Sequence, residues 1–109
     1  MTLKQVKDLF LTITKNCYHY HAWAQPDKYI VWAEDGQADA VHSDNKMEIQ
    51  VLQGTLDYFT KSEYDPLVNT IQQTMNSADM AWRLNSVQYE EDTKYIHYEW
   101  VWEVEQSVG

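Results

Sequence analysis

The residues from Tyr95 to Glu105 alternate between apolar and polar side chains, and this alternation constrains the fold more than any other stretch. A period of two held over eleven residues is typical of a β-strand with one face buried and the other in water. The apolar face carries Ile96, Tyr98, Trp100, Trp102 and Val104. The other face carries Tyr95, His97, Glu99, Val101, Glu103 and Glu105. The chain therefore needs a layer that covers one face of this strand.

Helical and extended patterns alternate along the rest of the sequence. Thr2 and Gln5 fit a capping box, and Asp65-Pro66 is typical of a helix start. Glu34-Asp35-Gly36 reads as a turn, and the change of apolar phase beside Gly54 indicates a β-bulge. The predicted elements are a helix over residues 2–15, strands over about 18–23, 29–33 and 47–60, a helix over 66–76, and a hairpin of 81–89 with 95–105. We therefore expect a single α+β domain over residues 1–109. Its mostly antiparallel sheet would have about four to five strands, two helices on one face and a C-terminal β-hairpin.

Charge and composition exclude several classes of function. The net charge is −9, and nucleic-acid binding needs a basic surface that this chain lacks. No apolar run approaches the roughly 20 residues that a membrane-spanning helix needs. A single cysteine excludes an intramolecular disulfide and suits a reducing compartment. We expect an intracellular, soluble domain that binds neither nucleic acid nor membrane.

One metal site deserves consideration, because Cys17, His19 and His21 alternate along a predicted strand and would share one face. Thiolate and imidazole suit zinc, with His42 or His97 as a possible fourth ligand. No paired Cys/His spacing supports this site, so a plain strand face is the preferred interpretation. A nucleophilic Cys17 also lacks an orienting third group, and we expect no catalytic residue and no cofactor.

Carboxylates and aromatic side chains are better interpreted as surfaces for other proteins. Acid–base catalysis by Glu99, Glu103 and Glu105 would need one carboxyl group in an apolar pocket, which a regular polar strand face does not offer. Five tryptophans and eight tyrosines are many for 109 residues. Most would form a core, and at least one, with Trp23 and Trp32 as candidates, would lie in a subunit contact.

Several segments carry a resemblance to a known family. They are Leu56-Asp-Tyr-Phe59, Tyr64-Asp-Pro-Leu67, Ser86-Val-Gln-Tyr-Glu-Glu91 and His97-Tyr-Glu-Trp100. In this order, after an N-terminal helix and the strand at 29–33, they resemble the tail-completion or tail-terminator proteins of long-tailed bacteriophages. The resemblance is one of architecture, since the family has no catalytic signature to compare.

The resemblance implies a virion structural protein without enzymatic activity. Such proteins form a ring, commonly hexameric, that caps the head-proximal end of the tail tube and contributes to head–tail joining. The implied partners are further copies of the chain, the tail-tube protein and the head connector. The implied location is the bacterial host cytoplasm during assembly and then the virion. The interface candidates are Glu99, Glu103, Glu105, Trp23, Trp32, Asp35, Asp39 and Asp44.

Two other functions stay open at this stage. The charge of −9 is compatible with an acidic DNA mimic, or another inhibitor module that binds a basic protein. Cys17, His19 and His21 leave open a small metal-binding protein.

Overall fold

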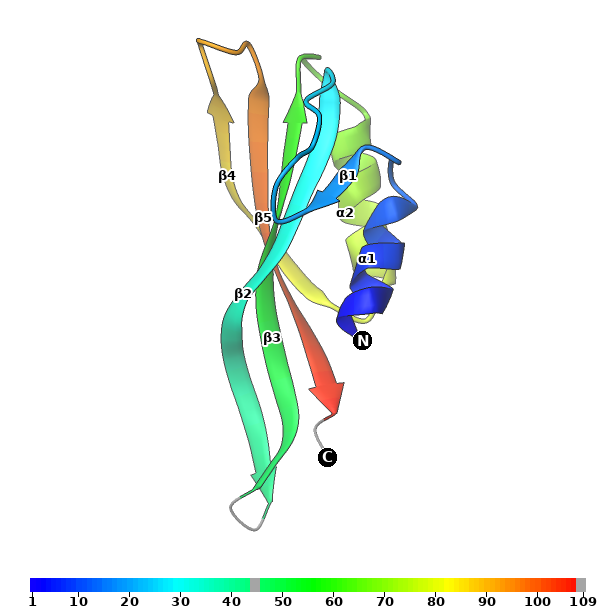
Figure 1. Ribbon diagram of the computed structural model, residues 1–109, viewed down its shortest axis with the longest axis vertical. Coiled ribbons are helices and arrows are strands. Elements are labelled where there is room, and N and C mark those ends of the chain that lie inside the picture. Colours follow the sequence, from blue (N-terminus) through cyan, green and yellow to red (C-terminus); the bar gives the residue numbers. More distant parts are fainter. Residues whose placement is uncertain (44–45, 108–109) are drawn as a thin grey trace.

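A computed structural model describes residues 1–43 and 46–107 of the chain (Figure 1). These residues form two helices and five strands, in the order α1 (Leu3–Leu11), β1 (Cys17–His19), β2 (Lys28–Ser43), β3 (Lys46–Thr60), α2 (Leu67–Ser77), β4 (Ala81–Tyr89) and β5 (Ile96–Ser107). The sheet order is β1-β2-β3-β5-β4. Among the described strands, β1 pairs with β2 in parallel, and the other neighbouring strands pair antiparallel. The predicted α+β class and C-terminal hairpin are confirmed.

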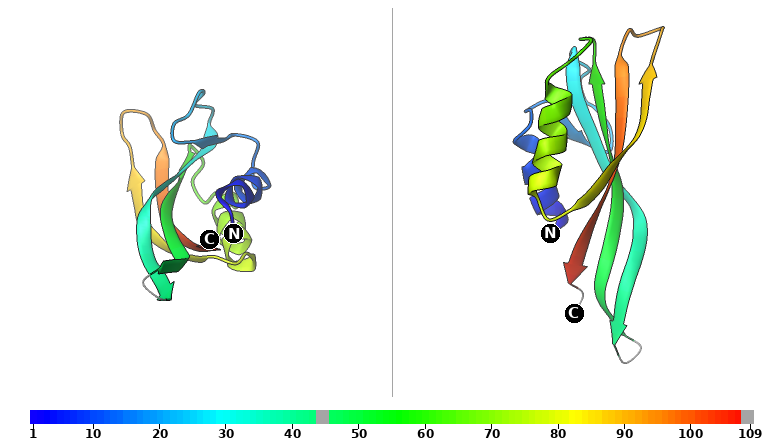
Figure 2. Two further views of the ribbon diagram at one scale, coloured as in Figure 1. Left: turned by 60° about the horizontal axis from the view of Figure 1, so that its bottom comes forward. Right: turned by 180° about the vertical axis from the view of Figure 1, so that it is seen from behind.

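Both helices lie on the same face of the sheet, and the part of the chain that the structure describes places no helix on the opposite face (Figure 2). Cross-strand partners share a face, so the register places Trp32, Leu56 and Trp100 beneath the helices. The side chains buried together there are Val6, Phe10, Ile30, Trp32, Leu56, Tyr58, Ile71, Met75, Trp100, Trp102 and Val104. We call the helix-free side the open face. In β3 and β5, which pair without a register shift, this face carries the residues that alternate with the buried ones, including Asp57, His97 and Glu99.

The ends of the helices have identifiable causes. Thr2 and Gln5 form the predicted capping box at the start of α1. This helix ends at Leu11, four residues before its predicted end. The Thr12 hydroxyl donates to the Leu9 carbonyl at 2.6 Å, and the Thr12 amide donates to the same oxygen at 3.1 Å. Both bonds reach the carbonyl oxygen three residues earlier, and they take the place of the four-residue hydrogen bonds of an α-helix, so the helix ends here.

The start of α2 is held by a buried carboxylate. The Asp65 side chain is fully buried, and its Oδ1 accepts a hydrogen bond of 2.9 Å from the Leu67 amide, the first of the helix. Its Oδ2 accepts from the hydroxyls of Tyr58 at 2.6 Å and Thr60 at 2.7 Å. Lys28 Nζ lies 3.3 Å from the same oxygen. One side chain therefore joins α2 to β2 and β3.

The prediction for β2 was wrong. We expected a strand over 29–33 and a turn at Glu34-Asp35-Gly36, but β2 continues to Ser43. The register shifts between Glu34 and Gly36, so Asp35 is an extra residue in a bulge. The backbone hydrogen bonds between β2 and β3 therefore outweigh the preference of Glu34-Asp35-Gly36 for a turn. The long β2–β3 pair extends well past the helices and contributes to an elongated molecule of 52 × 24 × 23 Å (Figure 1).

Two further expectations about the strands need correction. The strand predicted over 18–23 is only Cys17–His19, because Tyr20 adopts a φ of 72° that a continuing strand does not allow. The bulge expected beside Gly54 lies in the partner strand, opposite Gln53 and Gly54, while β3 pairs with β5 without a register shift.

Candidate functional site

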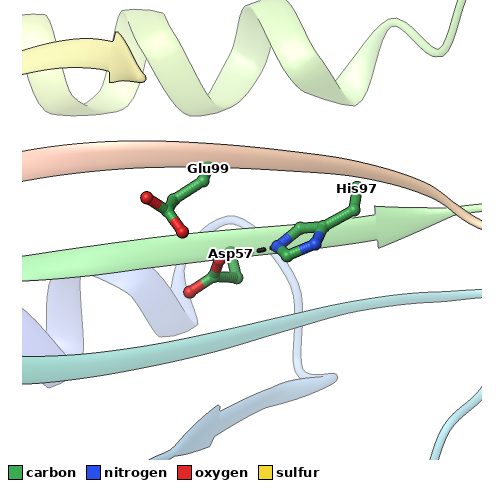
Figure 3. A group of neighbouring side chains, drawn as sticks. All are labelled: Asp57, His97 and Glu99. Atoms are coloured by element: carbon green, nitrogen blue, oxygen red, sulfur yellow. Dashed lines mark hydrogen bonds and ion pairs between the residues drawn. The ribbon is translucent and has the colours of Figure 1, made fainter. Parts of the chain in front are cut away.

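A cluster of charged side chains lies on the open face, across strands β3 and β5. Asp57 comes from β3, and His97 and Glu99 come from β5 (Figure 3). His97 Nε2 lies 2.6 Å from Asp57 Oδ1, and one donor atom from each of the three residues lies within 4.8 Å of the other two. Glu90, at the start of the β4–β5 turn, places Oε2 3.7 Å from His97 Nδ1. We call Asp57, His97 and Glu99 the histidine–carboxylate cluster.

Aromatic packing fixes the imidazole of this cluster. The His97 ring stacks on Phe59 with a centroid separation of 4.2 Å, and Phe59 stacks on Tyr29 at 4.7 Å. Tyr95 packs edge-on against Tyr29, and its single hydroxyl hydrogen lies between two acceptors, the carbonyl oxygens of Gln25 at 2.9 Å and Pro26 at 2.7 Å. The imidazole is therefore held against a rigid aromatic base.

The carboxylates around His97 also change its protonation. The hydrogen bond to Asp57 raises the pKa of His97 above its usual value. Burial of the ring lowers this pKa, whereas the charges of Asp57, Glu90 and Glu99 raise it further. The side chains of His97 and Asp57 are each only about one-fifth exposed. The cluster thus favours a positive charge between its carboxylates.

The three residues considered for a metal site do not form one group. Cys17 and His19 lie in β1 on the helix side, where His19 Nε2 contacts Glu34 Oε1 at 2.8 Å and the ring stacks on Trp32. His21 lies beyond the end of β1 and packs against Trp23. Within residues 1–43 and 46–107, the histidine–carboxylate cluster is where three potential metal ligands converge. His97 belongs to it and lies on the opposite face from Cys17 and His19.

The Cys17 thiol is expected to react slowly in the folded protein. Burial raises its pKa to about 12, so very little thiolate is present near neutral pH. A thiol reagent at pH 8 should modify native Cys17 at least tenfold more slowly than it modifies the chain unfolded in urea. Equal rates would show that the thiol is accessible in the folded state and ionises normally there.

Strand β4 forms one outer edge of the sheet and exposes apolar side chains. Leu84, Val87 and Tyr89 are 43%, 50% and 58% exposed. Leu84 is even-numbered and Val87 and Tyr89 are odd-numbered, but a register shift after Leu84 places all three side chains on the same face of the sheet. Val87 and Tyr89 also line a surface hollow together with Lys61, Glu63, Lys94 and Ile96. We call the exposed apolar residues of β4, with Lys61 and Lys94, the β4 edge.

The far half of β2 forms a different kind of edge. Strand β1 pairs only with Ile30–Trp32, so within the described residues β2 has no strand partner on its outer side beyond that point. Asp35 and Asp39 are exposed along this segment, which carries a second register shift between Gln37 and Asp39. Bulges and acidic residues are common on edges that must avoid unselective pairing. We call Asp35 and Asp39 with their segment the β2 edge.

The predicted interface residues occupy different surroundings. Trp32 is 2% exposed and packs against Phe10 and Trp102, so its prediction as a contact residue was wrong. Helix α1 covers the Trp32 indole. The sequence of the strand around Trp32 does not show that a helix lies over it. Trp23, in contrast, is 79% exposed. Asp44 lies outside the described residues.

Apart from Asp35 and Asp44, the predicted acidic contact residues divide into two groups. Asp39, Glu103 and Glu105 line one surface hollow together with Asp79. Glu99 instead belongs to the histidine–carboxylate cluster, where its Oε1 accepts a hydrogen bond of 2.9 Å from Asn85.

Sequence reasoning did not identify Asp57 or Glu90 as neighbours of His97. The strand pattern contained part of the signal, since Asp57 and Phe59 have the parity opposite to Leu56 and Tyr58. Recognising the cluster also requires the β3–β5 register, which pairs Asp57 with Glu99.

No helix among the described residues has the length and apolar character needed to cross a membrane. Compared with known proteins, the chain matches no protein-family model and no curated protein.

Proposed function

We propose that this chain is a structural subunit of a bacteriophage virion, a tail terminator or tail-completion protein. It would form a ring on the head-proximal end of the tail tube and contribute to head–tail joining. The observation that carries the proposal is the presence of two unlike, exposed sheet edges on one subunit. The β4 edge is apolar, and the hollow beside it is lined by two lysines and one carboxylate, Glu63, whereas the β2 edge is acidic.

Two complementary edges on one subunit favour head-to-tail association. The β4 edge of one copy would receive the β2 edge of the next, with Lys61 and Lys94 facing Asp35 and Asp39. Contacts between two different surfaces of identical subunits close into rings when the rotation between copies is suitable. Burial of Val87 and Tyr89 would supply the apolar centre of the contact, and the charges would select its orientation.

The terminator role is tested by the length of tail tubes. Assembly of tail-tube protein together with this chain is expected to give tubes of limited length, measured by electron microscopy. Tubes of unchanged length would contradict the terminator role, whereas a monomeric state of the isolated chain would not.

A matched pair of variants tests the β4 edge. Val87→Glu places a carboxylate within the apolar contact and opposite the β2 edge, so it is expected to abolish length control and any oligomer seen by native mass spectrometry. Gln88→Glu adds the same charge on the opposite face of the same strand and is expected to retain both. Equal behaviour of the two variants would exclude the β4 edge as the contact.

A further inference from the structure

The histidine–carboxylate cluster has the donor set of a metal site. It offers one imidazole and two carboxylates, and all three side chains project from paired strands (Figure 3). Imidazole suits zinc and similar transition-metal ions, whereas magnesium and calcium prefer an all-oxygen set. We propose that Asp57, His97 and Glu99 bind a divalent transition-metal ion of the zinc class. Water would complete the coordination on the open face.

The distances need only small side-chain movements. A tetrahedral zinc site with bonds of about 2.0–2.1 Å places its ligand atoms roughly 3.3 Å apart. His97 Nε2 and Asp57 Oδ1, now 2.6 Å apart, would separate slightly, while Glu99 would approach from within 4.8 Å. The ion would then lie between His97 Nε2 and Asp57 Oδ1, in place of the hydrogen bond that joins them.

Several neighbouring residues hold the side chains of the cluster in place. A metal-binding histidine usually donates its other ring nitrogen to a carboxylate or carbonyl group. Glu90 Oε2 lies 3.7 Å from His97 Nδ1, just beyond hydrogen-bond distance, and would need to move closer to accept this bond. Glu99 is oriented by Asn85, whose amide oxygen in turn accepts a hydrogen bond of 2.8 Å from Arg83. Phe59 fixes the plane of the imidazole. Orientation by neighbours of this kind reduces the cost of assembling the site.

The charge pattern also favours a cation. The register places Asp57 directly opposite Glu99, and two like charges in such a pair destabilise a sheet. Glu90 adds a third carboxylate within 4 Å of the ring. A divalent ion bound between these carboxylates would relieve this repulsion.

Calorimetric titration of the tag-free, chelator-treated full-length chain with zinc tests this proposal. We expect one zinc ion per chain, and at least tenfold weaker binding for His97→Gln and for Glu99→Gln. Glu99→Gln keeps an oxygen that can accept the hydrogen bond from Asn85, so this variant is expected to fold like the parent. Circular dichroism would check the fold of both variants. The control variants Cys17→Ser and His19→Gln are expected to bind zinc as the parent does.

Cobalt substitution provides an independent readout of the ligands. The cobalt-loaded protein is expected to absorb in the visible range without the charge-transfer band that a thiolate ligand produces. Absence of stoichiometric zinc binding by the parent chain would overturn the proposal. Unchanged binding by both His97→Gln and Glu99→Gln, or a thiolate band that Cys17→Ser removes, would equally overturn it.

Discussion

Replacing Gly54 with alanine is expected to lower the free energy of unfolding by about 3 kcal/mol, at the upper end of typical overpacking costs. A Cβ at this position would clash with the indole of Trp102 and with the carbonyl oxygen of Ala33, and it would lie 2.7 Å from Trp102 Cε2. Neither group has room to move, because Trp102 is fully buried and Ala33 belongs to the paired backbone of β2. Glycine is required here by the close approach of the indole to the backbone.

Gly36 provides the matched control for this substitution. It lies in the neighbouring strand, and a Cβ added there would meet nothing within 4 Å. Gly36→Ala is therefore expected to change stability by less than about 1 kcal/mol, because it mainly restricts the unfolded chain. Urea unfolding of both variants measures the difference. Equal stabilities would contradict the packing of Trp102 against Gly54.

Replacing Asp65 with alanine is expected to lower the free energy of unfolding by about 3–5 kcal/mol. The substitution removes the acceptor used by the Tyr58 and Thr60 hydroxyls and by the Leu67 amide. It also leaves Lys28 without its carboxylate. Asp92→Ala removes the same charge from an exposed position in the β4–β5 turn, and it should change stability by less than about 0.5 kcal/mol. Similar losses in the two variants would contradict the structural role of Asp65.

Acid unfolding gives a second readout of Asp65. Burial by itself would raise the pKa of this carboxyl group, but hydrogen bonds from Tyr58, Leu67, Thr60 and Lys28 together lower it. A lowered pKa means that the stabilisation is present above the unfolded value of about 3.9 and is lost as the pH falls through the folded value. The parent chain should therefore lose stability below about pH 4, and Asp65→Ala should show a flatter dependence in that range. Parallel curves would contradict the lowered pKa.

The elements that could be predicted from the sequence are those with strong local signals. The closing strand alternates because helices cover one face and water covers the other, so Trp100 and Trp102 are buried as expected. Thr2 with Gln5 forms a local bonding pattern that depends on few distant residues. The full length of β2 was missed because its outer half lies beyond the helices, where no core imposes alternation.

The histidine–carboxylate cluster could be predicted only in part. Residues two apart on a strand share a face, so the sequence of β5 alone places His97 and Glu99 together. The position of Asp57 depends on which strands pair, and β3 and β5 are separated by α2 and β4 in the chain. Trp32 illustrates the same limit, because its burial depends on a helix that comes from another part of the sequence.

The β3–β5 pairing has a consequence for how the chain folds. The two antiparallel pairs β2–β3 and β4–β5 each join neighbouring strands, so each can form early as a hairpin. The sheet becomes complete only when β3 and β5 meet, which closes a loop that contains α2 and β4. Until that moment both strands present unpaired edges, as β4 does on its outer side in the folded chain. If copies of the chain associate as proposed, completing the monomer and joining two copies would be the same physical event, the pairing of two exposed strands.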